Sequence, residues 1–216
     1  MIQVIATTPY TDQKMGTAGL RKKSKVVMQE HYFENFLQSI FNTIAPAGKT
    51  FVVGGDGRFY NSIAIQKLIK MAAANGVKKL IIGQNGFLST PASSNMILKR
   101  HTDGGFVLSA SHNPGGENGD FGIKFATETG GQCSSQVSDR IFANSQTISE
   151  FKTADAADVD LSRLGTQNLE GMEIEIVDPI SDYVELMEKI FDFELIKKMF
   201  ANGFTMRFDA MNAVPG

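Results

Sequence analysis

Apolar residues recur at two different spacings along the first half of the chain, and the two spacings predict different elements. At residues 31–44 and 62–75 the large apolar side chains lie three or four positions apart, which is typical of amphipathic helices. Gly76 follows the second segment, as glycine often follows a helix. Short uninterrupted apolar runs are typical of buried strands. Such runs occur at 51–53, 80–82 and 106–108.

Helices and strands are therefore expected to alternate along this part of the chain. A further helix is predicted at 90–99, where Thr90 precedes a proline in the first turn. Alternation of this kind predicts an α/β fold with a mixed, mainly parallel sheet and helices on both faces. Ligands of such sheets bind at the carboxyl ends of the strands. The polar segments expected at that edge are 54–58, 83–86 and the loop around Ser111.

The last third of the chain gives weaker signals. Residues 138–144 predict a short helix, and residues 154–171 are polar and acidic without clear periodicity, which favours a surface excursion. At 172–176 apolar residues alternate with glutamates, as in a half-exposed strand. Residues 183–200 predict one or two helices, and 204–208 predict another strand.

Composition narrows the class of protein. The chain has 216 residues, of which 42% are hydrophobic and 20% charged, as in an ordinary globular protein. A formal net charge of -2 and scattered lysines do not predict nucleic-acid binding. No apolar run approaches the roughly 20 residues of a transmembrane segment, and the first residues lack a basic leader. Because Cys133 is the single cysteine and cannot form an internal disulfide, a cytoplasmic location is predicted.

Candidate chemistry gathers in one loop after the strand at 106–108. The letters SASHNPGG at 109–116 describe a sharp turn that exposes Ser111 and His112. Lys124 follows soon afterwards, on a short strand. From these residue types alone, a simple surface turn and a phosphate-carrying serine are about equally good interpretations.

Further motifs occur in the same order as in one enzyme family. They are GTAGLRKK at 16–23, VGGDGR at 53–58, STPASS at 89–94 and DFGIK at 120–124. Together with the Ser111 loop they resemble the phosphoglucomutase branch of the α-D-phosphohexomutases, and the resemblance runs through essentially the whole chain. It implies domain I of that family at residues 1–187 and an incomplete start of a second, similar domain at 188–216. The chain would then be the amino-terminal part of a longer enzyme.

The resemblance also implies a reaction and its residues. The family interconverts glucose 1-phosphate and glucose 6-phosphate through a phosphoserine enzyme and glucose 1,6-bisphosphate. Ser111 would carry the phosphoryl group, and an oxygen of that phosphate would bind magnesium, whose remaining ligands lie in a later loop that this chain lacks. Lys124 would be the general acid/base, with His112 as a secondary catalytic residue. Arg21 and Thr17, together with Ser111, would contact the substrate.

Several charged residues near these motifs favour structural roles. Asp56 and Asp120 stand beside glycines and are predicted to form turns rather than to bind a metal. Arg58 suits a carboxylate lock on its own loop better than a phosphate contact. Lys22 and Lys23 are interpreted as solvated charges.

Departures from the family pattern leave a second function open. Ala18 stands where the family commonly has serine, and the segment around Cys133 lacks the usual prolines. The alternative is a noncatalytic binding or scaffold protein, like the parafusin and aciculin relatives. Apolar side chains at 183–208 would favour self-association or a protein partner. Without the later sugar and phosphate loops, the isolated chain is expected to be nearly inactive as a mutase.

Overall fold

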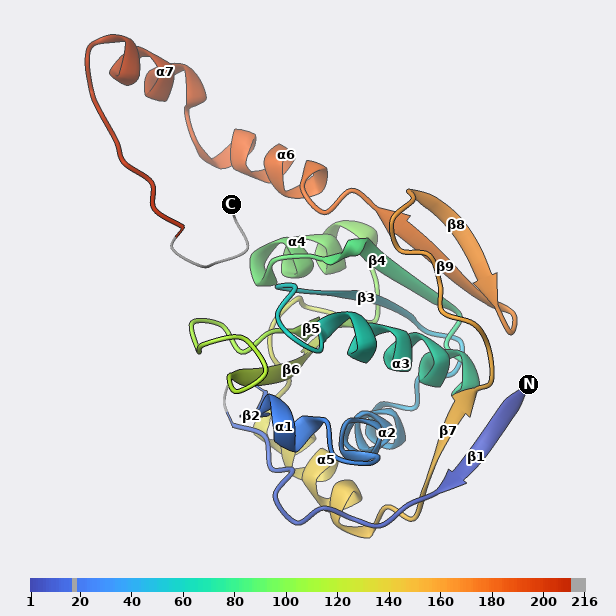
Figure 1. Ribbon diagram of the computed structural model, residues 1–216. Helices are drawn as coiled ribbons and strands as arrows, with labels where there is room; N and C mark the ends of the chain where they lie inside the picture. Colours follow the sequence, from blue (N-terminus) through green and yellow to red (C-terminus); the bar gives the residue numbers. More distant parts are fainter. Residues whose placement is uncertain (17–18, 211–216) are drawn as a thin grey trace.

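A computed structural model describes residues 1–16 and 19–210 of the chain (Figure 1). The strands are β1 (Ile2–Ala6), β2 (Leu20–Lys23), β3 (Thr50–Gly55), β4 (Lys79–Phe87), β5 (Gly104–Leu108), β6 (Asp120–Thr127), β7 (Glu150–Ala154), β8 (Gly165–Leu169) and β9 (Met172–Val177). The helices are α1 (Ser24–Val27), α2 (Tyr32–Ile44), α3 (Asn61–Ala74), α4 (Thr90–Arg100), α5 (Ser135–Thr147), α6 (Ser181–Ile190) and α7 (Phe193–Ala201).

A seven-stranded sheet forms the centre of the molecule, in the order β2-β6-β5-β3-β4-β9-β8. Its four inner strands, β5, β3, β4 and β9, are parallel to one another. Antiparallel strands flank them, with β6 and β2 on one side and β8 on the other. The predicted fold class, a mixed sheet with a mainly parallel centre, is confirmed.

Side chains of β3 alternate between two cores on opposite faces of the sheet. Phe51 and Val53 belong to the larger core, whereas Val52 belongs to the smaller one. Figure 1 shows α2 and α3 on the face of the larger core and α4 on the other face. Helices therefore cover both faces, as the sequence predicts.

Several strand assignments differ from the sequence prediction; β2 and β7, for example, were not predicted. Strand β4 continues to Phe87, so the segment 83–86 lies within a strand rather than in a loop at its end. Strand β8 lies inside the segment 154–171, which the sequence predicts to be a surface excursion. Because β8 is a mostly exposed edge strand, its residues are largely polar and do not alternate with apolar ones. Strand β1 was not predicted at all, and it pairs with the distant β7 in a separate two-stranded antiparallel ribbon.

The strand predicted at 204–208 is wrong, since these residues form no regular element. A strand needs a neighbour to pair its backbone N–H and C=O groups. Within residues 1–16 and 19–210, the strands of both sheets pair with other segments and none pairs with 204–208.

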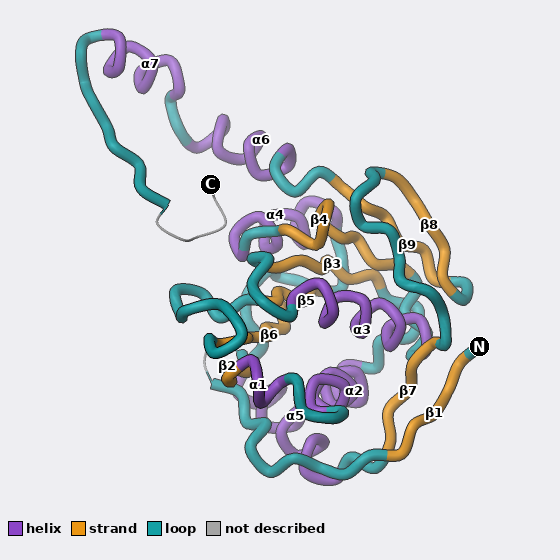
Figure 2. Tube along the Cα trace, viewed as in Figure 1, coloured by secondary structure: helices purple, strands orange, loops and turns teal. Residues whose placement is uncertain are grey.

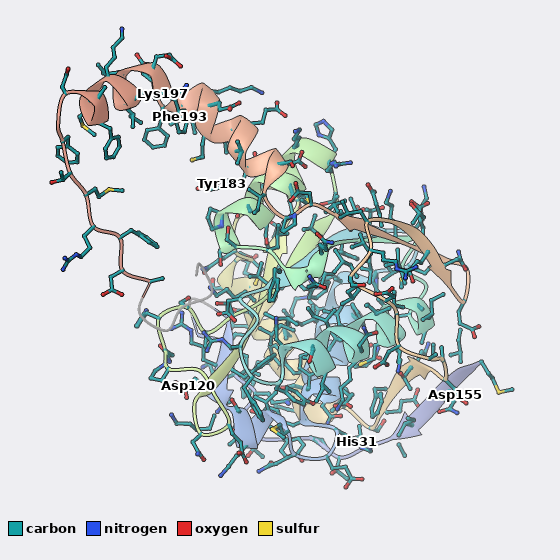
Figure 3. The ribbon with its side chains drawn as sticks, turned by 45° about the horizontal axis from the view of Figure 1, so that its top comes forward. His31, Asp120, Asp155, Tyr183, Phe193 and Lys197 are labelled. Atoms are coloured by element: carbon teal, nitrogen blue, oxygen red, sulfur yellow. The ribbon has the colours of Figure 1, made fainter. Side chains whose placement is uncertain are left out.

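The tail, defined as residues 181–210, contains two helices, α6 and α7, where the sequence predicts one or two at 183–200. Figure 2 shows α6 and α7 extending away from the sheets, and neither helix contains a buried residue. Tyr183 packs against the smaller core, and Figure 3 shows it beside the body, with Phe193 and Lys197 farther out. The boundary expected between residues 187 and 188 falls inside α6 and stays a prediction. In the described part of the chain, no helix combines the length and apolar content needed to cross a membrane.

Candidate active site

Ser111 lies just beyond the carboxyl end of β5, next to the carboxyl end of the parallel strand β3. Its side chain is exposed, as the sequence predicts. Its φ angle is 55°, a left-handed conformation that is uncommon for a residue other than glycine. Such a backbone persists only where surrounding contacts hold it, and it is enriched at functional sites.

Two cationic side chains meet at the hydroxyl of Ser111. Nη2 of Arg21 and Nζ of Lys124 each donate a hydrogen bond to Oγ at 3.0 Å. Strand alternation explains this convergence, because Leu20 and Ile123 face the larger core and their neighbours must point to the opposite face. The structure thus brings together three of the residues proposed from the sequence.

Gly122 allows the Ser111 loop to approach these cations. A Cβ atom at this position would lie 2.4 Å from the backbone oxygen of Ser109 and 3.1 Å from Cα of Ala110. Because glycine has no such atom, the chain leaving β5 can pass directly over β6. The sequence analysis did not assign this role to Gly122.

The ammonium group of Lys124 is poorly solvated. The residue is only 8% exposed. Burial lowers the pKa of Lys124, and the positive charges of Arg21 and Arg58 lower it further, whereas the carboxylate of Asp56 acts in the opposite direction. A lysine with a lowered pKa exchanges protons more readily near neutral pH, as a general acid/base must.

Arg58 holds the Ser111 loop from the β3 side. Its Nε donates to both carboxylate oxygens of Asp56, at 2.9 and 3.0 Å, and its Nη2 donates to Oδ2 at 2.8 Å. The same guanidinium donates from Nη1 to the backbone oxygen of Asp120 at 2.6 Å and from Nη2 to that of Ser111 at 3.0 Å. The carboxylate lock expected for Arg58 is present, and it extends to the loop itself.

Asp120 fixes the other end of the loop. It accepts hydrogen bonds from Nδ2 of Asn113 and from Nζ of Lys23, both at 2.8 Å. The hydrogen bond from Lys23, followed by that from Asn113, lowers the pKa of Asp120. Antiparallel pairing of β2 with β6 places Lys23 opposite Asp120, so Lys23 is an ion-pair partner rather than only a solvated charge. Lys22 is paired as well, with Asp12 at 2.8 Å.

His112, proposed from the sequence as a secondary catalytic residue, makes no hydrogen bond to the Ser111 hydroxyl. His112 is exposed, and in the described ranges its side chain forms no hydrogen bond and no ion pair. Thr17 lies outside the described residues, so its predicted substrate contact stays a prediction.

The residues around Ser111 do not by themselves fit a magnesium site. Across residues 1–16 and 19–210 there is no group of three or more His, Cys, Asp or Glu side chains arranged to hold a metal. The carboxylates of Asp56 and Asp120 are engaged by Arg58 and Lys23. Cations surround the hydroxyl, and such a donor set suits a phosphate rather than a divalent metal ion.

Ser109 is a residue of this site that sequence reasoning missed. Its hydroxyl lies 2.7 Å from Oδ2 of Asp56 and 2.9 Å from the backbone nitrogen of Ser111. The available signal was the position of Ser109 at the end of an apolar strand, where a buried hydroxyl can meet the residues that follow the neighbouring strand.

Comparisons with known proteins agree on one family. The model described as phosphoglucomutase/phosphomannomutase, alpha/beta/alpha domain I, matches residues 12–152. The chain is 52% identical to phosphoglucomutase of Rhizobium radiobacter over 100% of this chain and 40% of the relative, and 48% identical to chloroplastic phosphoglucomutase of Brassica napus over 100% and 35%.

Among solved structures, the open form of the exocytosis-sensitive phosphoprotein pp63/parafusin (phosphoglucomutase) from Paramecium superimposes with a TM-score of 0.92. It is 42% identical, and the match covers 99% of this chain and 41% of that one. The chain therefore spans about two fifths of the length of the relatives it matches.

Proposed function

Since this chain belongs to the phosphoglucomutase/phosphomannomutase family, we propose that it carries the phosphoserine part of a phosphoglucomutase, an isomerase acting on glucose 1-phosphate and glucose 6-phosphate. The observation that carries the proposal is the Ser111 hydroxyl held between Arg21 and Lys124. Glucose 1,6-bisphosphate is the phosphoryl donor that the proposal requires.

The proposed transfer uses each of these side chains. Oγ of Ser111 attacks a phosphorus of the bisphosphate, so a P–Oγ bond forms while the bond from phosphorus to the sugar oxygen breaks. Lys124 in its neutral form takes the hydroxyl proton and returns a proton to the sugar oxygen. Arg21 offers a planar set of donors to the transferring phosphate oxygens. When the first transfer releases glucose 6-phosphate, the reverse transfer moves the phosphoryl group from Ser111 to the free 6-hydroxyl of an incoming glucose 1-phosphate, which regenerates the bisphosphate and completes the isomerisation.

His112 and magnesium have smaller parts in this proposal. His112 directly follows Ser111 and is a secondary candidate for proton movement. Magnesium would meet only one ligand here, an oxygen of the phosphate on Ser111, so no step is assigned to it.

The test is transfer of phosphate to Ser111. The chain is incubated with glucose 1,6-bisphosphate and magnesium, and the product is analysed by intact mass and peptide mapping. We expect one phosphate on Ser111, none on Ser111→Ala, and loading slowed about 100-fold or more in Lys124→Met, as loss of general acid/base catalysis predicts. Lys152→Met, at an exposed lysine on β7, is the matched control and should load normally.

Two outcomes of this experiment would contradict the proposal: a folded chain that stays unphosphorylated, or phosphate on another residue. Because the chain spans about two fifths of its relatives, we expect loading without sustained interconversion of the two glucose phosphates.

A second candidate function is a binding or scaffold protein comparable to parafusin. The observation that favours it is the set of exposed apolar side chains on the tail, among them Phe191 at 52%, Leu195 at 64% and Phe208 at 71% exposure. Such a surface suits a second copy of the chain or another protein.

Sedimentation over a concentration series tests this second function. Concentration-dependent association that Leu195→Glu abolishes and Ser111→Ala leaves unchanged would support it, and a strictly monomeric chain at high concentration would contradict self-association.

The compartment stays open to experiment. Relatives are named for two locations, the chloroplast in Brassica napus and the cytoplasm in Populus tremula, so the cytoplasmic location of this chain remains a prediction.

A further inference from the structure

The buried hydroxyl of Ser109 connects Asp56 to the backbone of Ser111. Ser109 is 7% exposed, and its Oγ contacts both Oδ2 of Asp56 and the backbone nitrogen of Ser111. We propose that Ser109 is a positioning residue, whose hydroxyl, oriented by Asp56, accepts the Ser111 N–H and fixes the nucleophile in its left-handed conformation. This inference rests on the proposed function, since it concerns how the same serine is held for phosphoryl transfer.

The direction of both hydrogen bonds follows from the charge on Asp56. An ionised carboxylate can only accept, so the single O–H of Ser109 must donate to Oδ2. The Ser109 oxygen then has lone pairs free for the N–H of Ser111. Arg58 holds the carboxylate in place through its forked contact, and the Arg58 side chain is only 7% exposed.

Ser111 is therefore held on both sides of its Cα atom. Its N–H donates to Ser109, and its C=O accepts from Nη2 of Arg58 at 3.0 Å. With both peptide groups fixed, the Cα–Cβ bond has one direction, and from it Oγ reaches Arg21 Nη2 and Lys124 Nζ, each at 3.0 Å. Loss of the Ser109 hydroxyl would leave the N–H of Ser111, a residue in a strained conformation, without its acceptor.

The decisive comparison is Ser109→Thr with Ser109→Val. Threonine and valine have nearly the same shape, because valine carries a methyl group where threonine carries the hydroxyl. The first measurement is solvent exchange of the Ser111 amide by NMR in the unmodified chain, which requires no reaction. We expect exchange about tenfold faster in Ser109→Val than in Ser109→Thr, the factor for about 1.4 kcal/mol, which is within the range for one buried hydrogen bond.

The second measurement is the rate of phosphate loading from glucose 1,6-bisphosphate. We expect the maximal rate to fall about tenfold in Ser109→Val, while the bisphosphate concentration at half-maximal rate stays unchanged, and Ser109→Thr should retain the parent rate. A general loss of structure would not produce this separation. If Ser109→Val does not fold, Ser109→Ala, which removes the hydroxyl without adding a methyl group, is compared with the parent.

The two measurements test two claims separately: that Ser109 positions Ser111, and that this positioning matters for phosphoryl transfer. Equal amide exchange in the threonine and valine variants would overturn the positioning role of Ser109, whatever the loading rates. Faster exchange in the valine variant together with a parent chain that accepts no phosphate would support the structural role and contradict the proposed function. Faster exchange with an unchanged maximal rate would overturn the claim that this positioning matters for transfer.

Discussion

The molecule has two regions: the body, formed by the two sheets and α1 to α5, and the tail. Helices of both regions carry apolar side chains at similar spacing, but these side chains are buried in the body and exposed in the tail. Phe36 and Phe41 on α2 are each 1% exposed, whereas Leu195 and Phe200 on α7 are 64% and 41% exposed. Helices form in both regions because the spacing of apolar residues is a local property. Burial requires opposing elements, and only the body supplies them among the described residues.

The contact between the two regions is mainly polar. Nζ of Lys99 on α4 lies 2.7 Å from Asp182 and 2.6 Å from Glu185 on α6. Nδ2 of Asn95 also donates to the backbone oxygen of Asp182 at 2.9 Å. Exposed ion pairs contribute only about 0.2–1 kcal/mol each. The tail is thus attached through contacts that stabilise far less than the aromatic packing inside the body.

The largest effect is expected for one substitution made in each region. Phe106→Ala should destabilise the chain by about 3–5 kcal/mol, because it leaves a cavity beside the rings of Phe41, Phe51 and Phe125. Phe200→Ala should change stability by less than about 0.5 kcal/mol, as for an ordinary surface site. Urea unfolding followed by circular dichroism measures both. A similar loss in the free energy of unfolding for the two variants would contradict the distinction between body and tail.

A smaller effect is expected for alanine in place of a glycine. Gly122→Ala should cost about 1–3 kcal/mol, because the added Cβ would collide with the backbone oxygen of Ser109. It should also slow phosphate loading by moving Ser111 away from its cations. Gly203→Ala in the tail meets no neighbouring atom, and its strain, from a φ of 91°, is local to the end of α7. Thermal unfolding of the body should therefore shift for Gly122→Ala and stay unchanged for Gly203→Ala.

The smallest expected effect depends on pH. Because the pKa of Asp120 is lowered in the folded chain, its ionised form stabilises the fold, fully so above its ordinary pKa of 3.8 and less as the pH falls through the folded value. Asp120→Asn should cost about 1 kcal/mol at pH 7, since its partner Lys23 is largely exposed, and the difference should shrink below pH 3.8.

Urea unfolding at several pH values measures this difference, with Asp139→Asn at an exposed position as the control. A cost for Asp120→Asn that stays constant into the acid range would refute the role of its charge.

The sequence predicts the features that depend on local pattern and misses those that depend on the pairing of distant segments. The helix at Tyr32–Ile44 and the buried strands follow from spacing within a few residues, and Ser111, Arg21 and Lys124 follow from motifs in a familiar order. The roles of Ser109 and Gly122 depend on which strand lies beside which, and this information is not local. Strand β1 is missed for the same reason, and the strand at 204–208 is predicted but not formed because strand propensity alone provides no partner.

The ribbon of β1 and β7 has a consequence for the time at which the chain folds during synthesis. Ile2 pairs with Ala154 and Ala6 with Glu150, so β1 must wait for residues made some 150 positions later. At about 5–20 residues per second, this delay is roughly 8–30 s. During that interval β1, whose Ile2 and Val4 are still 50% and 58% exposed in the finished fold, has no partner strand from its own chain, and a chaperone that binds extended apolar segments would find it there.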